Sequence, residues 1–108
     1  MPETEPDHVA AVLERARQQS EEFRRIKRSV EALEVTGSSR HDEVRVTLRG
    51  SHQVTDVSID ADAISQYDAD ELGDIVKEAL NDSLRRLNEA TAARFRPIIE
   101  AASRTETI

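Results

Sequence analysis

The sequence predicts an α+β protein in which a small antiparallel sheet of three strands lies between two long helices. Apolar residues follow a helical spacing in residues 8–32 and again in residues 68–96, and they alternate with polar residues between 33 and 60. Turn-forming residues divide the alternating stretch into three short runs, which is typical of consecutive hairpins. The predicted order of elements is therefore α-β-β-β-α.

The first helix is predicted over residues 8–32. Two sets of positions repeat every seven residues, namely Val9, Ala16, Phe23 and Val30, and then Val12, Gln19, Ile26 and Leu33. This heptad pattern indicates a narrow apolar stripe that needs a partner along its length, either the second helix or the same helix of another subunit. Residues 1–8, which carry two prolines and three acidic side chains, are predicted to be a disordered acidic tail.

Three strands are predicted between the helices, over residues 33–36, 43–49 and 55–60, with Gly37 ending the first. Val44, Val46 and Leu48 share one face of the middle strand, and the residues between them are polar or charged. A sheet of this size is marginal by itself, so the helices are expected to cover its apolar face.

The second long helix follows a connector in which Ala63 and Ile64 are predicted to form a single helical turn. Asp68 and Glu71 have the spacing of a capping box at the start of this helix. Pro97 lacks a backbone N–H, so it is predicted to kink the helix or to end it near residue 96. We therefore expect one domain over residues 9–96, followed in 97–108 by the helix end and a flexible tail.

The composition predicts an oligomer and excludes several kinds of site. Only 37% of the 108 residues are hydrophobic and 3% are aromatic, a poor supply for a self-sufficient core, so we expect a homodimer. The absence of Cys excludes disulfides, thiolate metal ligands and Cys nucleophiles. No apolar run reaches the length of a membrane span, and the acidic first eight residues differ from a signal peptide. We expect a cytoplasmic protein that does not engage a membrane.

The charges are unevenly distributed along the chain. The net charge is −7, and residues 53–70 contain five acidic residues and no basic one. Residues 9–32, in contrast, carry a net charge of +2, so the first helix is the more basic part of the molecule. A nucleic-acid-binding protein usually shows a basic surface, and here only the helices offer one.

Four segments resemble the YbaB/EbfC family of bacterial nucleoid-associated proteins. They are "LEVTG" at 33–37, "VRVTLRG" at 44–50, "VTDVSID" at 54–60 and "ELGDIVKEALNDSLRRL" at 71–87, the last of which includes Asn81 and Asp82. They occur in the family's order and spacing, and the resemblance covers residues 10–96.

The resemblance implies a protomer that dimerises mainly through its strands and holds its helices outward as arms. It also implies DNA binding with low sequence specificity, in the nucleoid, with a role in transcription or chromosome organisation. The chain departs from the family in the charged, Gly-poor loop "GSSRHDE" and in a first helix that mixes Arg with Glu. An alternative is therefore a protein-interaction module on the same fold, for example one that binds a secretion-associated or regulatory partner, with weak or no DNA binding.

The candidate DNA-binding residues are the basic side chains of the two helices. They are Arg15, Arg17, Arg24, Arg25, Lys27, Arg28, Arg85 and Arg86. Helical spacing also allows ion pairs that would neutralise some of them, such as Glu21 with Arg25 and Arg28 with Glu31. The candidate dimer-interface residues are Val35, Val44, Val46, Leu48, Val57 and Ile59.

No enzyme activity, metal site or cofactor is predicted. The three histidines, His8, His41 and His52, lie in the tail, in a loop and beside a turn, and no motif for catalysis or phosphate cradling is present. Asp56, Asp60 and Asp62 lack the dense ligand series of a calcium loop and are interpreted as a solvated strand end.

Overall fold

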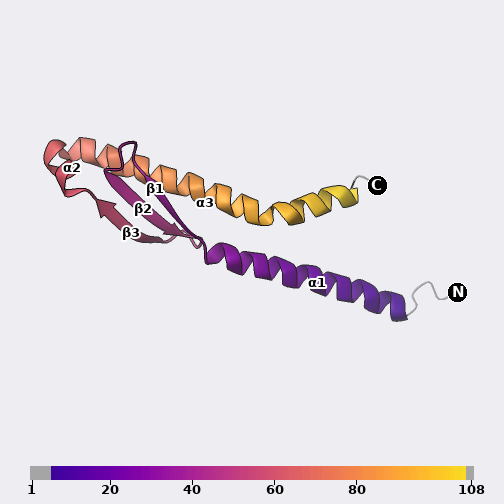
Figure 1. The fold of residues 1–108 in the computed structure, drawn as a ribbon. Coiled ribbons are helices and arrows are strands. Elements are labelled where there is room, and N and C mark those ends of the chain that lie inside the picture. Colours follow the sequence, from indigo (N-terminus) through magenta and orange to yellow (C-terminus); the bar gives the residue numbers. More distant parts are fainter. Residues whose placement is uncertain (1–5, 107–108) are drawn as a thin grey trace.

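The computed structural model describes residues 6–106, and it confirms the predicted α+β fold. The elements are α1 (Pro6–Glu31), β1 (Glu34–Ser38), β2 (Val44–Arg49), β3 (Val54–Ile59), α2 (Ala61–Gln66) and α3 (Ala69–Glu106). Figure 1 shows α3 lying along the sheet and continuing beyond it, while α1 leaves the same end of the sheet as a second arm. The molecule is strongly elongated, with extents of 81 × 26 × 16 Å.

The sheet has the strand order β1-β2-β3, and both pairs of strands are antiparallel. Glu34 pairs with Arg49 and Ser38 with Arg45, so Gly37 lies inside β1 and does not end it as predicted. Between β2 and β3 the register shifts next to Thr47, which places Val54 opposite Leu48. β1 and β3 are the two edge strands of the sheet.

The core lies between β2 and α3. Val44, Val46 and Leu48 are almost completely buried, and they pack with Ala79 and Leu87 of α3. The side chains of Val44, Val46 and Leu48, which were expected at a dimer interface, are therefore already covered within one chain. Alternation identifies the apolar face of a strand but not what covers it, and here a helix of the same chain covers these residues.

β1 and α3 approach each other unusually closely at Gly37. A Cβ atom at this position would lie 2.1 Å from the backbone nitrogen of Ser83 and 2.5 Å from its Cα. Ser83 is fully buried, and its hydroxyl group donates a hydrogen bond to the Leu80 carbonyl oxygen. The missing Cβ atom of Gly37 and the small side chain of Ser83 thus allow the strand to lie directly on the helix.

The helix boundaries follow local signals, with one difference from the prediction. Asp68 accepts a hydrogen bond from the Glu71 N–H at 2.8 Å, which confirms the capping box. α2 begins after Asp60, whose carboxylate accepts a hydrogen bond from the Asp62 N–H. α3 does not end at residue 96 but continues through Pro97 to Glu106, and Figure 1 shows it bending in its C-terminal part. A proline removes one hydrogen bond of the helix, and a bend accommodates its ring.

The ends of the chain differ in part from the predicted tails. Residues 6–8 of the predicted acidic tail belong to α1, and residues 97–106 of the predicted C-terminal tail belong to α3. Residues 1–5 and 107–108 lie outside the described residues. Within the described range, no helix combines the length and the apolar character needed to cross a membrane.

One apolar surface remains open beside the core. α3 covers β1 and β2 but not β3, although Val57 and Ile59 pair with Val46 and Val44 and so lie on the same face of the sheet. Val54, Val57 and Ile59 are 39–52% exposed. We call these three residues the β3 strip.

Candidate nucleic-acid interface

The basic side chains of α1 are accessible to solvent. All six predicted cations of this helix are exposed, namely Arg15, Arg17, Arg24, Arg25, Lys27 and Arg28. The helix itself is exposed over every residue from His8 to Arg25, because most of its length projects beyond the sheet. The basic residues therefore lie on an arm that a large ligand can approach from several sides.

Most of these cations have no acidic partner on their own helix. Arg17 lies 3.4 Å from Glu14, which is a loose and exposed ion pair. Among the residues that the structure describes, neither Glu21 with Arg25 nor Arg28 with Glu31 forms an ion pair within 4.0 Å. The cations of the second half of α1 are thus free to contact an external anion.

Three of the arginines form a row along α1. Arg17, Arg24 and Arg28 are seven and four residues apart, so the helical period places them on one face. The row is roughly 16 Å long at the usual rise of an α-helix. An extended row of cations matches an extended anion better than a small one.

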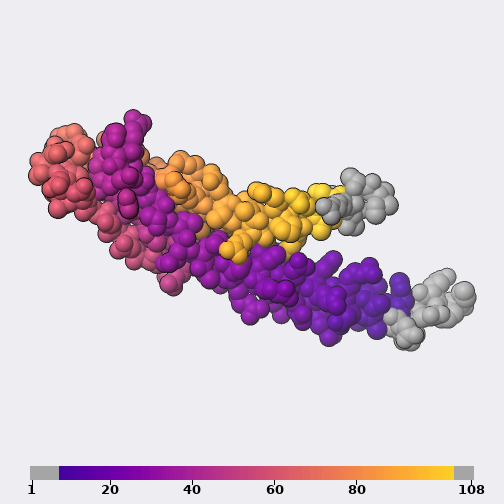
Figure 2. All heavy atoms as spheres, viewed as in Figure 1, coloured from indigo at the N-terminus to yellow at the C-terminus, as the bar shows by residue number. Residues whose placement is uncertain are grey.

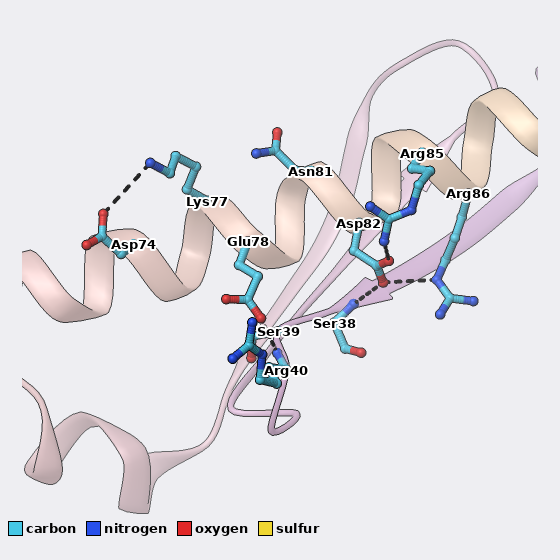
Figure 3. Close-up of a pocket in the computed structure, with 10 residues that line it drawn as sticks. All are labelled: Ser38, Ser39, Arg40, Asp74, Lys77, Glu78, Asn81, Asp82, Arg85 and Arg86. Atoms are coloured by element: carbon cyan, nitrogen blue, oxygen red, sulfur yellow. Dashed lines mark hydrogen bonds and ion pairs between the residues drawn. The ribbon is translucent and has the colours of Figure 1, made fainter.

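The two predicted arginines of α3 pair with a carboxylate of their own helix. Arg85 and Arg86 both bind the Asp82 carboxylate, Arg86 through its Nε atom at 2.9 Å. Asp82 also accepts a hydrogen bond from the Ser38 N–H of β1 at 2.9 Å, as Figure 3 shows. Helical spacing allows the two ion pairs, but the sequence does not reveal the contact with β1, because Ser38 and Asp82 are 44 residues apart.

Asp82 is therefore the residue that fastens the end of β1 to α3. The Ser38 N–H and then the Arg86 guanidinium hold its pKa below the usual value of 3.8, and its side chain is only 12% exposed. Asp82 in turn raises the pKa of Arg86. Since the folded-state pKa is lowered, the carboxylate stabilises the fold above pH 3.8, and this contribution disappears as the pH falls through the folded-state value.

Replacing Asp82 by Asn is expected to lower the free energy of unfolding by about 2 kcal/mol at pH 7, because the hydrogen bonds to a charged acceptor are weakened. The difference between the variant and the unaltered protein should shrink as the pH falls below 3.8. Urea unfolding followed by circular dichroism at pH 7 and pH 3 measures both effects. Asp74→Asn, at an exposed position of the same helix, is the control and should change stability by less than about 0.5 kcal/mol. An equal loss in both variants would contradict this role.

A shallow polar cleft of about 730 Å³ surrounds Asp82 between α3 and the loop after β1. Figure 3 shows the Asn81 amide extending away from the labelled acidic groups, while Asp74 pairs with Lys77. The cleft is lined by Arg40, Lys77, Arg85 and Arg86 but also by Asp74, Glu78 and Asp82. Cations and anions are thus mixed, and the cleft does not present the concentrated positive charge that a phosphate would require.

The charged loop after β1 is held by Glu43. Its carboxylate accepts hydrogen bonds from the Ser39 hydroxyl at 2.7 Å and from the His41 N–H at 3.0 Å. The Ser39 hydroxyl is the main reason that the pKa of Glu43 is lowered. The loop therefore has a defined hydrogen-bonded form despite its lack of internal glycine. Across residues 6–106, no cluster of three His or acidic residues suits a metal ion.

Comparison with known proteins identifies the family. Residues 6–102 match the sequence profile of the YbaB/EbfC DNA-binding family. The chain belongs to the YbaB/EbfC DNA-binding family. This family is one of DNA-binding proteins and not of enzymes, and the membership confirms the resemblance seen in the strand and helix segments of the sequence.

Two curated relatives of this YbaB/EbfC chain are each named nucleoid-associated protein. The one from Buchnera aphidicola subsp. Baizongia pistaciae is 31% identical over 83 residues, which covers 77% of this chain and 76% of the relative. The one from Corynebacterium kroppenstedtii is 32% identical over 97 residues, which covers 90% of this chain and 96% of the relative. The crystal structure of an uncharacterized protein from Helicobacter pylori is also similar, with a TM-score of 0.55. The match covers 69% of this chain and 87% of the Helicobacter pylori chain. At 21% identity, that structure shows a shared fold.

Proposed function

We propose that this YbaB/EbfC protein is a homodimeric nucleoid-associated protein that binds duplex DNA with low sequence specificity. It acts in the cytoplasm at the nucleoid, where the name of its relatives, nucleoid-associated protein, places them. Its proposed role there is in chromosome organisation or transcription regulation. The observation that carries the proposal is the exposed row of Arg17, Arg24 and Arg28 on α1, two of which have no ion-pair partner within 4.0 Å in the described part of the chain.

The proposed mechanism is electrostatic. Arginines on the arm contact phosphates and release condensed counterions, and such contacts carry little information about the base sequence. The net charge of −7 opposes binding only from a distance, because physiological salt screens charges over about 8 Å. A local basic arm can therefore function on an acidic protein, with an affinity that depends strongly on salt.

The second part of the proposal is a dimer formed through the β3 strip. β3 is an edge strand with unpaired backbone groups on its outer side, and its apolar residues stay about half exposed in one chain. An open edge with an apolar face is a surface that natural proteins normally cover. Of the predicted interface residues, Val57 and Ile59 belong to this strip, and Val35 packs instead beside the core.

Replacing Val57 by Asp is expected to convert the dimer into monomers, because it places a charge in the proposed apolar interface. Light scattering coupled to size-exclusion chromatography at 10–100 μM, an order-of-magnitude range for such contacts, gives the mass directly. Ser58→Asp adds the same charge on the opposite face of β3 and should leave the dimer intact. A monomeric unaltered protein would rule out the dimer.

DNA binding is tested by titrating a long duplex with the full chain at salt concentrations of about 20–200 mM, the range over which phosphate contacts lose most of their affinity. We expect binding at low salt that weakens steeply as salt rises, with little difference between duplexes of unrelated sequence. Absence of binding at about 20 mM salt would reject the proposal and favour the alternative, a protein-interaction module on the same fold.

A further inference from the structure

The two arms touch each other through a pair of phenylalanines. The rings of Phe23 in α1 and Phe95 in α3 have centroids 5.7 Å apart and planes tilted by 42°. Figure 1 shows that the chain approaches the sheet along α1 and leaves it along α3, so the two helices run in opposite directions. Figure 2 shows the C-terminal part of α3 resting against α1. This contact fixes which sides of the two helices are neighbours.

Helix geometry then assigns the flanking residues to two edges. When two right-handed helices run in opposite directions and touch at one residue each, the residues that directly follow the contact lie on the same side of the pair. Arg24 and Arg96 follow the two phenylalanines, so they share one edge. Glu22 and Arg94 precede them and share the opposite edge.

A crevice between the arms supports this assignment. It has a volume of about 460 Å³, and Glu22, Ile98 and Ala101 are among its lining residues. The helical period places Ile98 and Ala101 on the same side of α3 as Arg94. The crevice therefore lies on the edge of Glu22 and Arg94, away from the edge of Arg24 and Arg96.

We infer that Arg96 is a further phosphate-binding residue, which together with Arg17, Arg24 and Arg28 forms one basic edge contributed by both arms. The inference rests on the proposed DNA binding. Arg96 is exposed and has no ion-pair partner within 4.0 Å among the described residues, unlike Arg85 and Arg86, which bind Asp82. The ligand is the sugar–phosphate backbone of duplex DNA, because a row of guanidinium groups on two helices suits repeated phosphates and not a single base.

The neighbourhood of Arg96 also explains why Arg94 should not contribute equally. Arg94 is just two residues away and equally exposed, but its edge carries Glu22 and the apolar wall of the crevice. The basic edge itself includes acidic residues, Glu21 and Glu100, at helical spacing from the arginines. Binding through this edge is therefore expected at low salt, where attraction to phosphate is strongest.

The test compares Arg96→Gln with Arg94→Gln, two variants with the same net charge in the same helix. The affinity of the full-length protein for a fluorescein-labelled duplex is measured by anisotropy at several salt concentrations. Arg96→Gln is expected to reduce the slope of log affinity against log salt by about one for each arm that contacts DNA. Arg94→Gln should keep the slope of the unaltered protein, and Arg96→Lys should restore it because it retains the charge.

The possible outcomes separate this inference from the proposed function. If the unaltered protein binds DNA and Arg24→Gln weakens binding, but Arg96→Gln and Arg94→Gln give the same slope, the assignment of Arg96 is overturned and DNA binding stands. If the unaltered protein does not bind DNA at low salt, the proposed function fails and the inference fails with it. Circular dichroism melting of each variant checks that the helix content and the stability of the whole protein are unchanged.

Discussion

Alanine at position 37 is expected to lower the free energy of unfolding by about 3 kcal/mol or more. The added Cβ would lie between 2.1 and 2.7 Å from three backbone atoms of Asp82 and Ser83 in α3. A flexible side chain could rotate away, but a helix backbone can only move as a unit. Such a movement would separate Ala79 and Leu87 from the strands that they cover. The cost is therefore a loss of packing over the whole core.

Thermal or urea unfolding at a fixed protein concentration measures this effect, since the apparent stability of an oligomer depends on concentration. Gly73→Ala is a matched control, because Gly73 lies inside α3 and a Cβ there meets nothing within 4 Å. It should stabilise the protein by about 0.5–1 kcal/mol through the better helix propensity of alanine. Similar losses in both variants would contradict the close contact between β1 and α3.

The triple variant Arg17→Ala, Arg24→Ala, Arg28→Ala is expected to lose at least about 100-fold in DNA affinity near 100 mM salt. Each phosphate contact contributes about 0.9 to the slope of log affinity against log salt, so three lost contacts lower the slope by nearly three for each arm. Fluorescence anisotropy with one labelled duplex over a salt series gives the affinity and the slope together.

The control for this experiment removes three charges elsewhere. Arg45 and Arg49 on the open face of β2 and Lys77 on α3 are also exposed. Their combined replacement by Ala gives the same net charge as the triple α1 variant, but it should preserve most of the salt dependence. Equal losses in the two triple variants would show that the overall charge, and not the arm, determines binding.

The sequence was sufficient for the order of the elements because each has a strong local signal. The heptad repeat from Val9 predicts α1, alternation around Val46 predicts β2, and Asp68 with Glu71 predicts the start of α3. The continuation through Pro97 could not be predicted, since a proline in a helix is compatible with either a bend or an end.

The site could be predicted only in part, because its tertiary contacts join distant residues. The basic residues of α1 are visible in the sequence, and their exposure follows from a helix with a narrow apolar stripe. Helical spacing allows Asp82 to pair with Arg85 and Arg86, but the hydrogen bond from the Ser38 N–H to Asp82 depends on β1 lying beside α3, and the core position of Val46 depends on α3 covering β2. Spacing along one sequence contains no information on either contact.

The exposure of α1 from His8 to Arg25 has a thermodynamic consequence. Outside its contact with α3 around Phe23, this stretch relies largely on its own backbone hydrogen bonds, and a helix without tertiary packing is only marginally stable in water. Its outer turns can unwind without disturbing the sheet. A partner that keeps these turns helical must therefore offset the conformational entropy that they lose. Part of the interaction free energy is then used to order α1 itself.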